Sequence, residues 1–231
     1  MGYLREHGIK AVCFDIDGTF YPKWQTDIYL LRCALRHPVF SMRYNSMRQK
    51  MRKEDALEAG PLLSLREFRA KELRISGMKL DLDSYIRKYE KYMLEPWQKS
   101  YGMLVPFDHV RQSVSRLRDC GYITAALSDF PLEGKLEALG LDGLFDYTAS
   151  TEDSGYLKPN ARPFMEMLRE LDLDADETLY AGDSYSKDVI GASNAGMHTL
   201  LIRKDAVKKE KYPLADLLLT SWKSFDRIII D

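Results

Sequence analysis

The spacing of hydrophobic and polar positions divides the chain into an alternating region and a helical region. Short apolar runs occur at residues 9–16 and recur through residues 122–202, where segments with apolar residues every three or four positions separate them. Such runs are typical of strands covered on both faces, and the wider spacing is typical of amphipathic helices. The predicted strands are IKAVCFDI, YITAAL, LFDYTAS, ETLYAG and HTLLI. This alternation predicts an α/β fold built on a doubly wound, Rossmann-like parallel sheet.

Residues 22–100 have a different pattern, with helical spacing and no good strand. Proline and glycine separate the helical stretches. These stretches are DIYLLRCALRH, SMRYNSMRQKMRKEDALEAG, LSLREFRAKELRIS and LDSYIRKYEKYML. We therefore predict a Rossmann-like core domain made of residues 1–21 and 101–231, with a smaller, all-helical domain of residues 22–100 inserted after the first strand.

Composition and charge narrow the possible functions. The formal net charge of -1 arises from 34 basic and 35 acidic residues, so no global field favours nucleic acid or an anionic membrane. No apolar run approaches the length of a membrane span, and the charged start MGYLREHGIK lacks the apolar stretch of a secretory signal. The cysteines are three in number and have no metal-like spacing, which is typical of reduced thiols. We expect a cytoplasmic protein.

Polar residues that can carry chemistry follow three of the predicted strands. Asp15, Ser128 and Asp183 each stand just past an apolar run. Because ligands of such sheets bind at the carboxyl ends of the strands, these side chains are expected to converge. Asp17 lies only two residues after Asp15, and two carboxylates that close repel each other unless a metal or a shared proton compensates. The pattern predicts a site at this edge of the sheet.

Four motifs in order give the chain a family resemblance. They are DIDGT after the first strand, Ser128 in ALSDF, Lys158 in YLKPN, and Asp183 with Asp188 in GDSYSKD. The chain resembles the haloacid dehalogenase superfamily of phosphohydrolases, with residues 22–100 in the place of that superfamily's helical cap domain. The resemblance covers almost the whole length. It implies a magnesium-dependent phosphatase that hydrolyses a small phosphate monoester through an aspartyl-phosphate intermediate.

The resemblance assigns the two catalytic roles to the first motif. Asp15 is expected to be the nucleophile, since carboxylates can form aspartyl-phosphates. Asp17 is expected to donate a proton to the leaving oxygen and then to accept one from water, for which its pKa must rise above the ordinary value of about 3.9. Members that cleave carbon–halogen bonds lack an acid at this position, so the chain resembles the phosphatases. Taken alone, Asp15 is equally compatible with a strand-end carboxylate that caps a turn.

The resemblance also implies a magnesium site and a phosphate site. Asp15 and Asp183 would supply carboxylate ligands and Asp17 its backbone carbonyl, while Asp188 would bind through water or orient its neighbours. Ser128 and Lys158 would hold the phosphoryl group. Asp129 follows Ser128 where the family often has asparagine. An inward-pointing Asp129 would hinder anionic substrates, whereas an outward-pointing one would offer only its backbone amide.

Several alternatives stay open from the sequence. A phosphotransferase or phosphomutase acting on sugar phosphates would use the same motifs, and a non-catalytic phosphate-binding scaffold would keep the fold. The basic run between Arg32 and Lys53 is either a grip on an anionic group or a solvated helix face. Trp97 and the nearby tyrosines are expected to pack as the core and hinge of the helical domain. The partner is expected to be a small phosphorylated metabolite, and the oligomeric state is left open.

Overall fold

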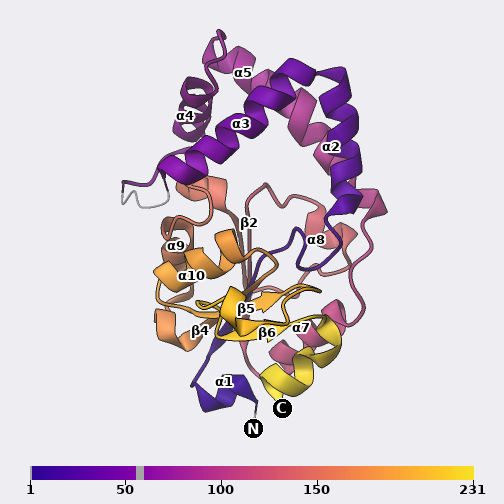
Figure 1. The fold of residues 1–231 in the computed structure, drawn as a ribbon, viewed down its shortest axis with the longest axis vertical. Coiled ribbons are helices and arrows are strands. Elements are labelled where there is room, and N and C mark those ends of the chain that lie inside the picture. Colours follow the sequence, from indigo (N-terminus) through magenta and orange to yellow (C-terminus); the bar gives the residue numbers. More distant parts are fainter. Residues whose placement is uncertain (1, 56–59) are drawn as a thin grey trace.

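The computed structural model describes residues 2–55 and 60–231, which form one parallel sheet with helices on both faces and a helical layer beyond one edge (Figure 1). The sheet has the strand order β3-β2-β1-β4-β5-β6. Its strands are β1 (Ala11–Phe14), β2 (Ile123–Ser128), β3 (Tyr147–Ser150), β4 (Thr178–Gly182), β5 (His198–Ile202) and β6 (Leu217–Leu219). The five predicted strands are confirmed, as is the predicted fold class. The three-residue strand β6 was not predicted.

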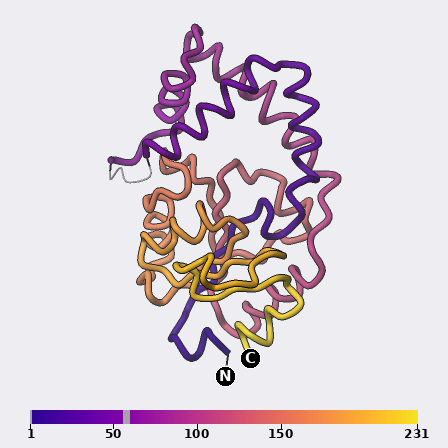
Figure 2. The backbone as a smooth tube through the Cα atoms, viewed as in Figure 1, coloured from indigo at the N-terminus to yellow at the C-terminus, as the bar shows by residue number. Residues whose placement is uncertain are grey.

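Helices cover both faces of the sheet because alternate strand residues point to opposite sides. Val12 and Phe14 belong to the hydrophobic core beneath α7, whereas Ala11 and Cys13 belong to the core beneath α9 and α10. The helices of this part are α1 (Tyr3–Glu6), α7 (Val110–Asp119), α8 (Lys135–Ala138), α9 (Arg162–Leu171) and α10 (Ile190–Asn194). Short 3₁₀ or π turns span Thr151–Ser154, Ala175–Glu177, Tyr185–Val189, Lys209–Lys211, Trp222–Ser224 and Asp226–Ile230. Both termini lie at the edge of the sheet opposite the helical layer (Figure 2).

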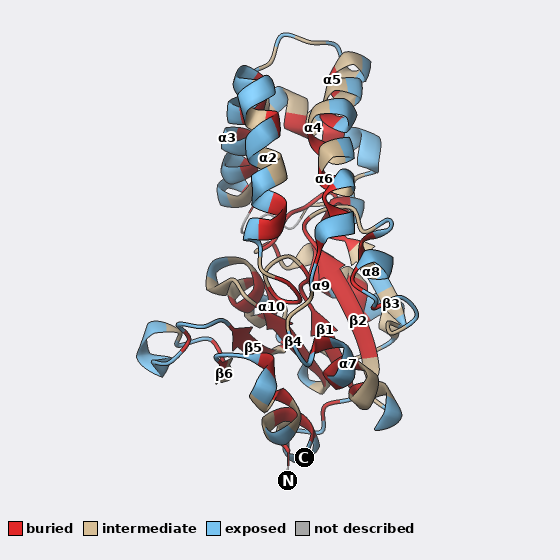
Figure 3. Cartoon of the chain, turned by 90° about the vertical axis from the view of Figure 1, so that its right-hand side faces the viewer, coloured by how far each residue is buried: buried red, intermediate tan, exposed pale blue. Residues whose placement is uncertain are grey.

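The helical layer, here called the helical segment, comprises residues 24–54 and 65–99. Its helices are α2 (Trp24–Arg36), α3 (Pro38–Glu54), α4 (Leu65–Ser76), α5 (Leu82–Tyr89) and α6 (Glu95–Lys99), with a π turn at Glu90–Leu94 between the last two and a 3₁₀ turn at Tyr101–Met103 after them. It has its own core of aromatic and methionine side chains, and its outer faces are exposed (Figure 3). Residues 56–59, the end of one predicted helix, lie outside the described residues.

The lengths and polarity of the helices bear on membrane association. Within residues 2–55 and 60–231, no helix combines the length and apolarity that a membrane crossing requires.

Candidate active site

The predicted convergence at the carboxyl edge of the sheet is present in the structure. Asp15 directly follows β1, and its backbone N–H donates to the carbonyl of Ala181 in β4 at 2.9 Å. Ser128 ends β2, and Asp183 directly follows β4. Since β2 and β4 pair with the two sides of β1, the fold brings three distant parts of the sequence together.

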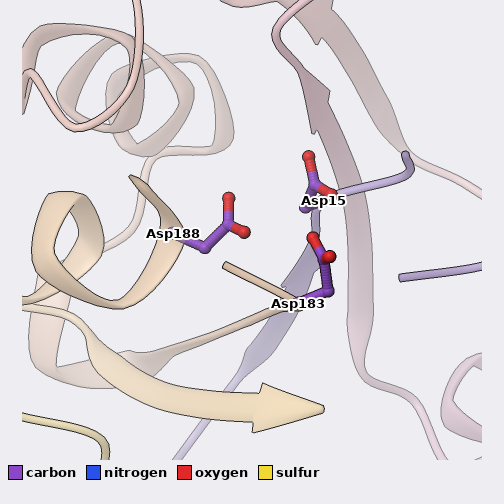
Figure 4. A group of neighbouring side chains, drawn as sticks. All are labelled: Asp15, Asp183 and Asp188. Carbon is purple, nitrogen blue, oxygen red and sulfur yellow. The ribbon is translucent and has the colours of Figure 1, made fainter. Parts of the chain in front are cut away.

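Three carboxylate side chains lie close together at this edge of the sheet. Asp15, Asp183 and Asp188 each offer an oxygen atom within 4.8 Å of the others, and their side chains face one another (Figure 4). Burial and the neighbouring acids raise the pKa of Asp15 to about 8 and that of Asp183 to about 6. Three hard oxygen donors crowded in this way suit a divalent cation such as magnesium, which would relieve their repulsion.

Gly18 makes room for this cluster. Its φ of +104° lies in the region that favours glycine, and a Cβ atom placed there would lie 2.5 Å from the Oδ2 atom of Asp183. The glycine of the DIDGT motif therefore serves both the turn after β1 and the position of the Asp183 carboxylate.

Lys158 neutralises this acidic cluster from within the protein. Its Nζ atom donates to Asp15 Oδ1 at 2.7 Å, to Asp188 Oδ1 at 2.9 Å and to the Tyr180 hydroxyl at 2.8 Å. Burial by itself lowers the pKa of Lys158, but the charges of Asp15 and Asp188 outweigh it and raise the pKa well above the ordinary value. Lys158 is thus a charged ammonium group although it is 1% exposed.

Asp17 has a separate set of partners. Lys135 Nζ lies 2.9 and 3.0 Å from its two carboxylate oxygens, Ser128 Oγ donates to Oδ2 at 2.9 Å, and the Tyr21 hydroxyl donates to Oδ1. Burial raises the pKa of Asp17, but Lys135 and the hydrogen bonds outweigh burial and lower it. The direction differs from the sequence expectation of a raised pKa, because the sequence did not reveal a second buried cation.

Lys135 is a buried site residue that sequence reasoning missed. It stands at the first position of α8 and is 0% exposed. In GKLEALGL a lysine after glycine has the pattern of a solvated helix start, and Asp17 is 118 residues away. No local signal in the sequence distinguishes it from a surface lysine.

Asp129, where the family often has asparagine, points inward but is neutralised. Its Oδ2 atom accepts a hydrogen bond from Arg52 at 2.8 Å, and its Oδ1 atom accepts from Thr151 and from the Lys158 backbone N–H. Burial raises its pKa, but Arg52 and Lys187 outweigh this and hold the pKa well below the usual range. Asp129 therefore points inward, and the positive charges of Arg52 and Lys187 balance the negative charge that it adds near the phosphate site.

The basic run of the helical segment is in part buried against the core. Arg48 Nη1 lies 2.5 Å from Glu152 Oε1, and its Nη2 donates to the Asp129 carbonyl at 2.7 Å. Arg69 of α4 also pairs with Glu152, and Glu72 accepts from both arginines. The interpretation as a solvated face is wrong for Arg48, because it is 3% exposed and contributes to a buried ion cluster between α3, α4 and the core.

A cavity of about 180 Å³ opens onto these residues. Its walls include five acids from three of the motifs, three cations and two aromatic rings, namely Asp15, Asp17, Asp129, Asp183, Asp188, Lys23, Lys187, Arg203, Trp97 and Phe130. Trp97 therefore packs in the hydrophobic core beneath α7 and also lines this cavity. A larger cavity of about 810 Å³ is lined by residues of α4, α5 and α8, but none of its lining residues belongs to the four motifs.

The chain is similar in sequence and in fold to known proteins. Residues 12–202 match the family model described as haloacid dehalogenase-like hydrolase. The chain is 27% identical to the glyceraldehyde 3-phosphate phosphatase of Methanopyrus kandleri, covering 85% of this chain and 84% of that protein. It is 29% identical to the ribulose-1,5-bisphosphate 5-phosphatase of Halopiger xanaduensis, covering 83% of each. A solved phosphatase of the same superfamily from Thermococcus onnurineus has the same fold, with a TM-score of 0.62 at 20% identity over 95% of this chain and 97% of that one.

Proposed function

The chain belongs to the haloacid dehalogenase-like hydrolase family, and on that premise we propose that it is a phosphatase that hydrolyses a small phosphate monoester through an aspartyl-phosphate on Asp15. The observation that carries this proposal is the different surroundings of the two aspartates. Asp15 faces Lys158 and two further carboxylates, whereas Asp17 stands apart from that cluster on its own hydrogen bonds. This difference supports the proposal that Asp15 attacks phosphorus and Asp17 moves protons.

The reaction follows from these positions. A carboxylate oxygen of Asp15 attacks the phosphorus atom, the bond to the leaving oxygen breaks, and Asp17 gives that oxygen its proton. Water then attacks the aspartyl-phosphate, Asp17 takes the proton of this water, and inorganic phosphate leaves with Asp15 restored. Lys158 balances the charge of the phosphoryl group throughout. Ser128, which donates to Asp17 in this structure, can turn its hydroxyl to a phosphoryl oxygen.

Asp17 must be protonated for the first step, although its pKa is lowered in this structure. Substrate binding has two effects that raise the pKa of Asp17. The negative phosphoryl group disfavours a second charge beside it, and the loss of the Ser128 hydrogen bond removes one partner of the carboxylate form. Both raise the pKa of Asp17 when a proton donor is needed.

Magnesium fits the acidic cluster. Asp15 and Asp183 would hold it through carboxylate oxygens, Asp17 through its backbone carbonyl, and Asp188 would bind directly or orient Lys158, to which it already hydrogen bonds. When bound, the ion supplies positive charge beside the transferring phosphoryl oxygens.

The size and lining of the cavity support a small substrate. At about 180 Å³ the cavity is below the common range of roughly 300–1,000 Å³ for ligand pockets. Lys23, Lys187 and Arg203 line it and favour an anion. We propose that the helical segment acts as the cap over this cavity and that the substrate resembles the phosphorylated sugars after which the two phosphatase relatives are named. The three cysteines are unpaired, in keeping with the expected cytoplasmic location.

Phosphate release tests the proposal. The wild type should release inorganic phosphate from glyceraldehyde 3-phosphate and p-nitrophenyl phosphate with magnesium and lose activity with a chelator. Asp15→Asn should reduce kcat by at least about 1,000-fold, because the amide is a poor nucleophile. The matched control is Asp176→Asn, an exposed position before β4 outside the candidate site, which should retain wild-type rates.

Two outcomes would contradict the proposal. Activity that survives Asp15→Asn removes the nucleophile assignment. A phosphorylated, isomerised product without free phosphate indicates a phosphomutase instead.

A further inference from the structure

We propose that Lys135 is a positioning residue that holds the Asp17 carboxyl group in the orientation needed to protonate the leaving oxygen, an inference that rests on the proposed phosphatase function. Lys135 lies outside the four family motifs that the sequence reveals. Its side chain reaches the site from the start of α8.

The contacts of Lys135 are those of an orienting group. Its Nζ atom lies 2.9 Å from one oxygen of Asp17 and 3.0 Å from the other, so both oxygens are fixed relative to one donor. Tyr21 contacts Oδ1 only and Ser128 contacts Oδ2 only. Once the Ser128 hydroxyl turns to the phosphoryl group, Lys135 is the partner that still holds both oxygens.

The surroundings of Lys135 hold the lysine itself in place. It is 0% exposed, and its Nζ atom lies 5.0 Å from the ring centre of Trp97 and 5.5 Å from that of Tyr101. Aromatic faces attract a cation at this range, so they help to offset its loss of water. Trp97 also lines the catalytic cavity. The helical segment and the residues that follow it therefore form part of the support for the proton donor.

A buried lysine is a costly structural element, which argues for a role beyond packing. Removing a cation from water is strongly unfavourable, and an apolar side chain of the same volume could fill the space without that cost. Two buried lysines are found among residues 2–55 and 60–231, with Lys158 on Asp15 and Lys135 on Asp17. Each carboxylate of the DIDGT motif thus has its own cation, and the two aspartates can stay close without sharing a partner.

The test compares substrates that differ in their need for a proton donor. p-Nitrophenolate leaves readily without protonation, whereas the alkoxide of glycerol 3-phosphate does not. With Lys135→Met, we expect kcat/KM, which reports the steps up to departure of the leaving group, to fall about 100-fold for glycerol 3-phosphate and less than about 5-fold for p-nitrophenyl phosphate. Lys135→Arg should recover part of the lost rate, because a guanidinium group can still contact both oxygens.

Controls separate this role from a structural one. Lys99→Met, an exposed lysine at the end of α6, should leave both rates unchanged. Asp17→Asn should show the same substrate preference as Lys135→Met, and adding Lys135→Met to Asp17→Asn should cost little more, since the lysine acts through the aspartate. Circular dichroism and thermal unfolding identify the folded variants, and if Lys135→Met does not fold, Lys135→Arg against Lys135→Gln gives the same comparison.

The outcomes distinguish the two proposals. Equal losses of kcat/KM on both substrates, or no loss on either, overturn the positioning role of Lys135 while the phosphatase function stands. Absence of turnover by the wild type on both substrates overturns the phosphatase function, and the role of Lys135 falls with it.

Discussion

Asp15 and Asp17 are separated by one residue in the sequence, yet their carboxylates have different surroundings. Asp15 lies with Lys158, Asp183 and Asp188, and burial and the neighbouring acids raise its pKa to about 8. Asp17 lies with Lys135 and two hydroxyl groups, and its pKa is lowered. The repulsion between the two acids is therefore balanced by two separate buried lysines, and a metal ion at the three-carboxylate cluster would add to the balance on the Asp15 side only.

Gly18→Ala tests whether the glycine of the DIDGT motif makes room for the Asp183 carboxylate at the proposed metal site. The new Cβ atom would lie 2.5 Å from Asp183 Oδ2, so the carboxylate must move. We expect the apparent affinity for magnesium to fall by at least about 10-fold, a loss of the size seen when groups supporting metal ligands are changed. Isothermal titration with magnesium measures it.

Gly77→Ala is the matched control. Gly77 also has a positive φ, of +62°, but no atom lies within 4 Å of the Cβ position. This variant carries a similar backbone strain far from the site and should keep wild-type magnesium affinity. Equal affinity in Gly18→Ala would show that Asp183 does not bind the ion.

Elements of the helical segment are joined to the core by a buried ion cluster. Glu152 follows β3, and it pairs with Arg48 of α3 and Arg69 of α4, while Glu72 accepts from both arginines. All four side chains are at most 5% exposed. The cluster places α3 and α4 relative to the core, and with Arg52 on Asp129 it brings the basic run of α3 to the edge of the catalytic site.

Glu152→Gln should destabilise the protein. The substitution leaves two buried guanidinium groups short of one negative charge, and removing one partner of a buried ion pair costs about 3 kcal/mol or more. Urea unfolding monitored by circular dichroism gives the free energy of unfolding. Asp83→Asn is the control, because the Arg66–Asp83 pair is exposed and its loss should cost under about 1 kcal/mol. A change below about 1 kcal/mol in Glu152→Gln would show that the cluster does not hold these elements together.

For single elements, the local hydrophobic pattern predicted the strands that are buried on both faces. The strands of five and six residues have uniform burial on both faces, and continuous apolar runs predicted them. Strand β6 has only three residues and was missed, and the predicted helix at SKDVIGASNAGM begins as a π turn over Tyr185–Val189. A short strand depends on its neighbour in the sheet, which the local sequence does not show.

On the scale of the whole molecule, the pH dependence of stability should change when magnesium binds. In the folded chain the pKa values of Asp15 and Asp183 are about 8 and about 6, against about 3.9 in an unfolded chain. The folded state therefore holds extra protons between pH 4 and pH 8, and the contribution of these groups to the free energy of unfolding decreases as pH rises through that window. A magnesium ion bound to these carboxylates would replace the protons.

The increase in Tm on adding magnesium is accordingly expected to be larger at pH 8 than at pH 5. Differential scanning calorimetry at fixed magnesium concentration measures it. Asp183→Asn should reduce the increase at pH 8, because it removes one ligand of the cluster. An increase that is the same at both pH values in the wild type would be evidence against a metal site formed by these carboxylates.

The sequence by itself determined the fold class, the family and the residues of the four motifs. Strand and helix periodicity follows from local side-chain geometry, and motif residues at strand ends must meet because parallel strands present their carboxyl ends at one edge. The tertiary structure decided which partner each acid has. Lys135 and Asp17, or Arg48 and Glu152, are separated by more than 100 residues, and their contacts depend on how helices pack on the sheet. The charged partners in a buried site are neighbours in space and not in the sequence. The packed fold was therefore needed to show which lysine pairs with which aspartate.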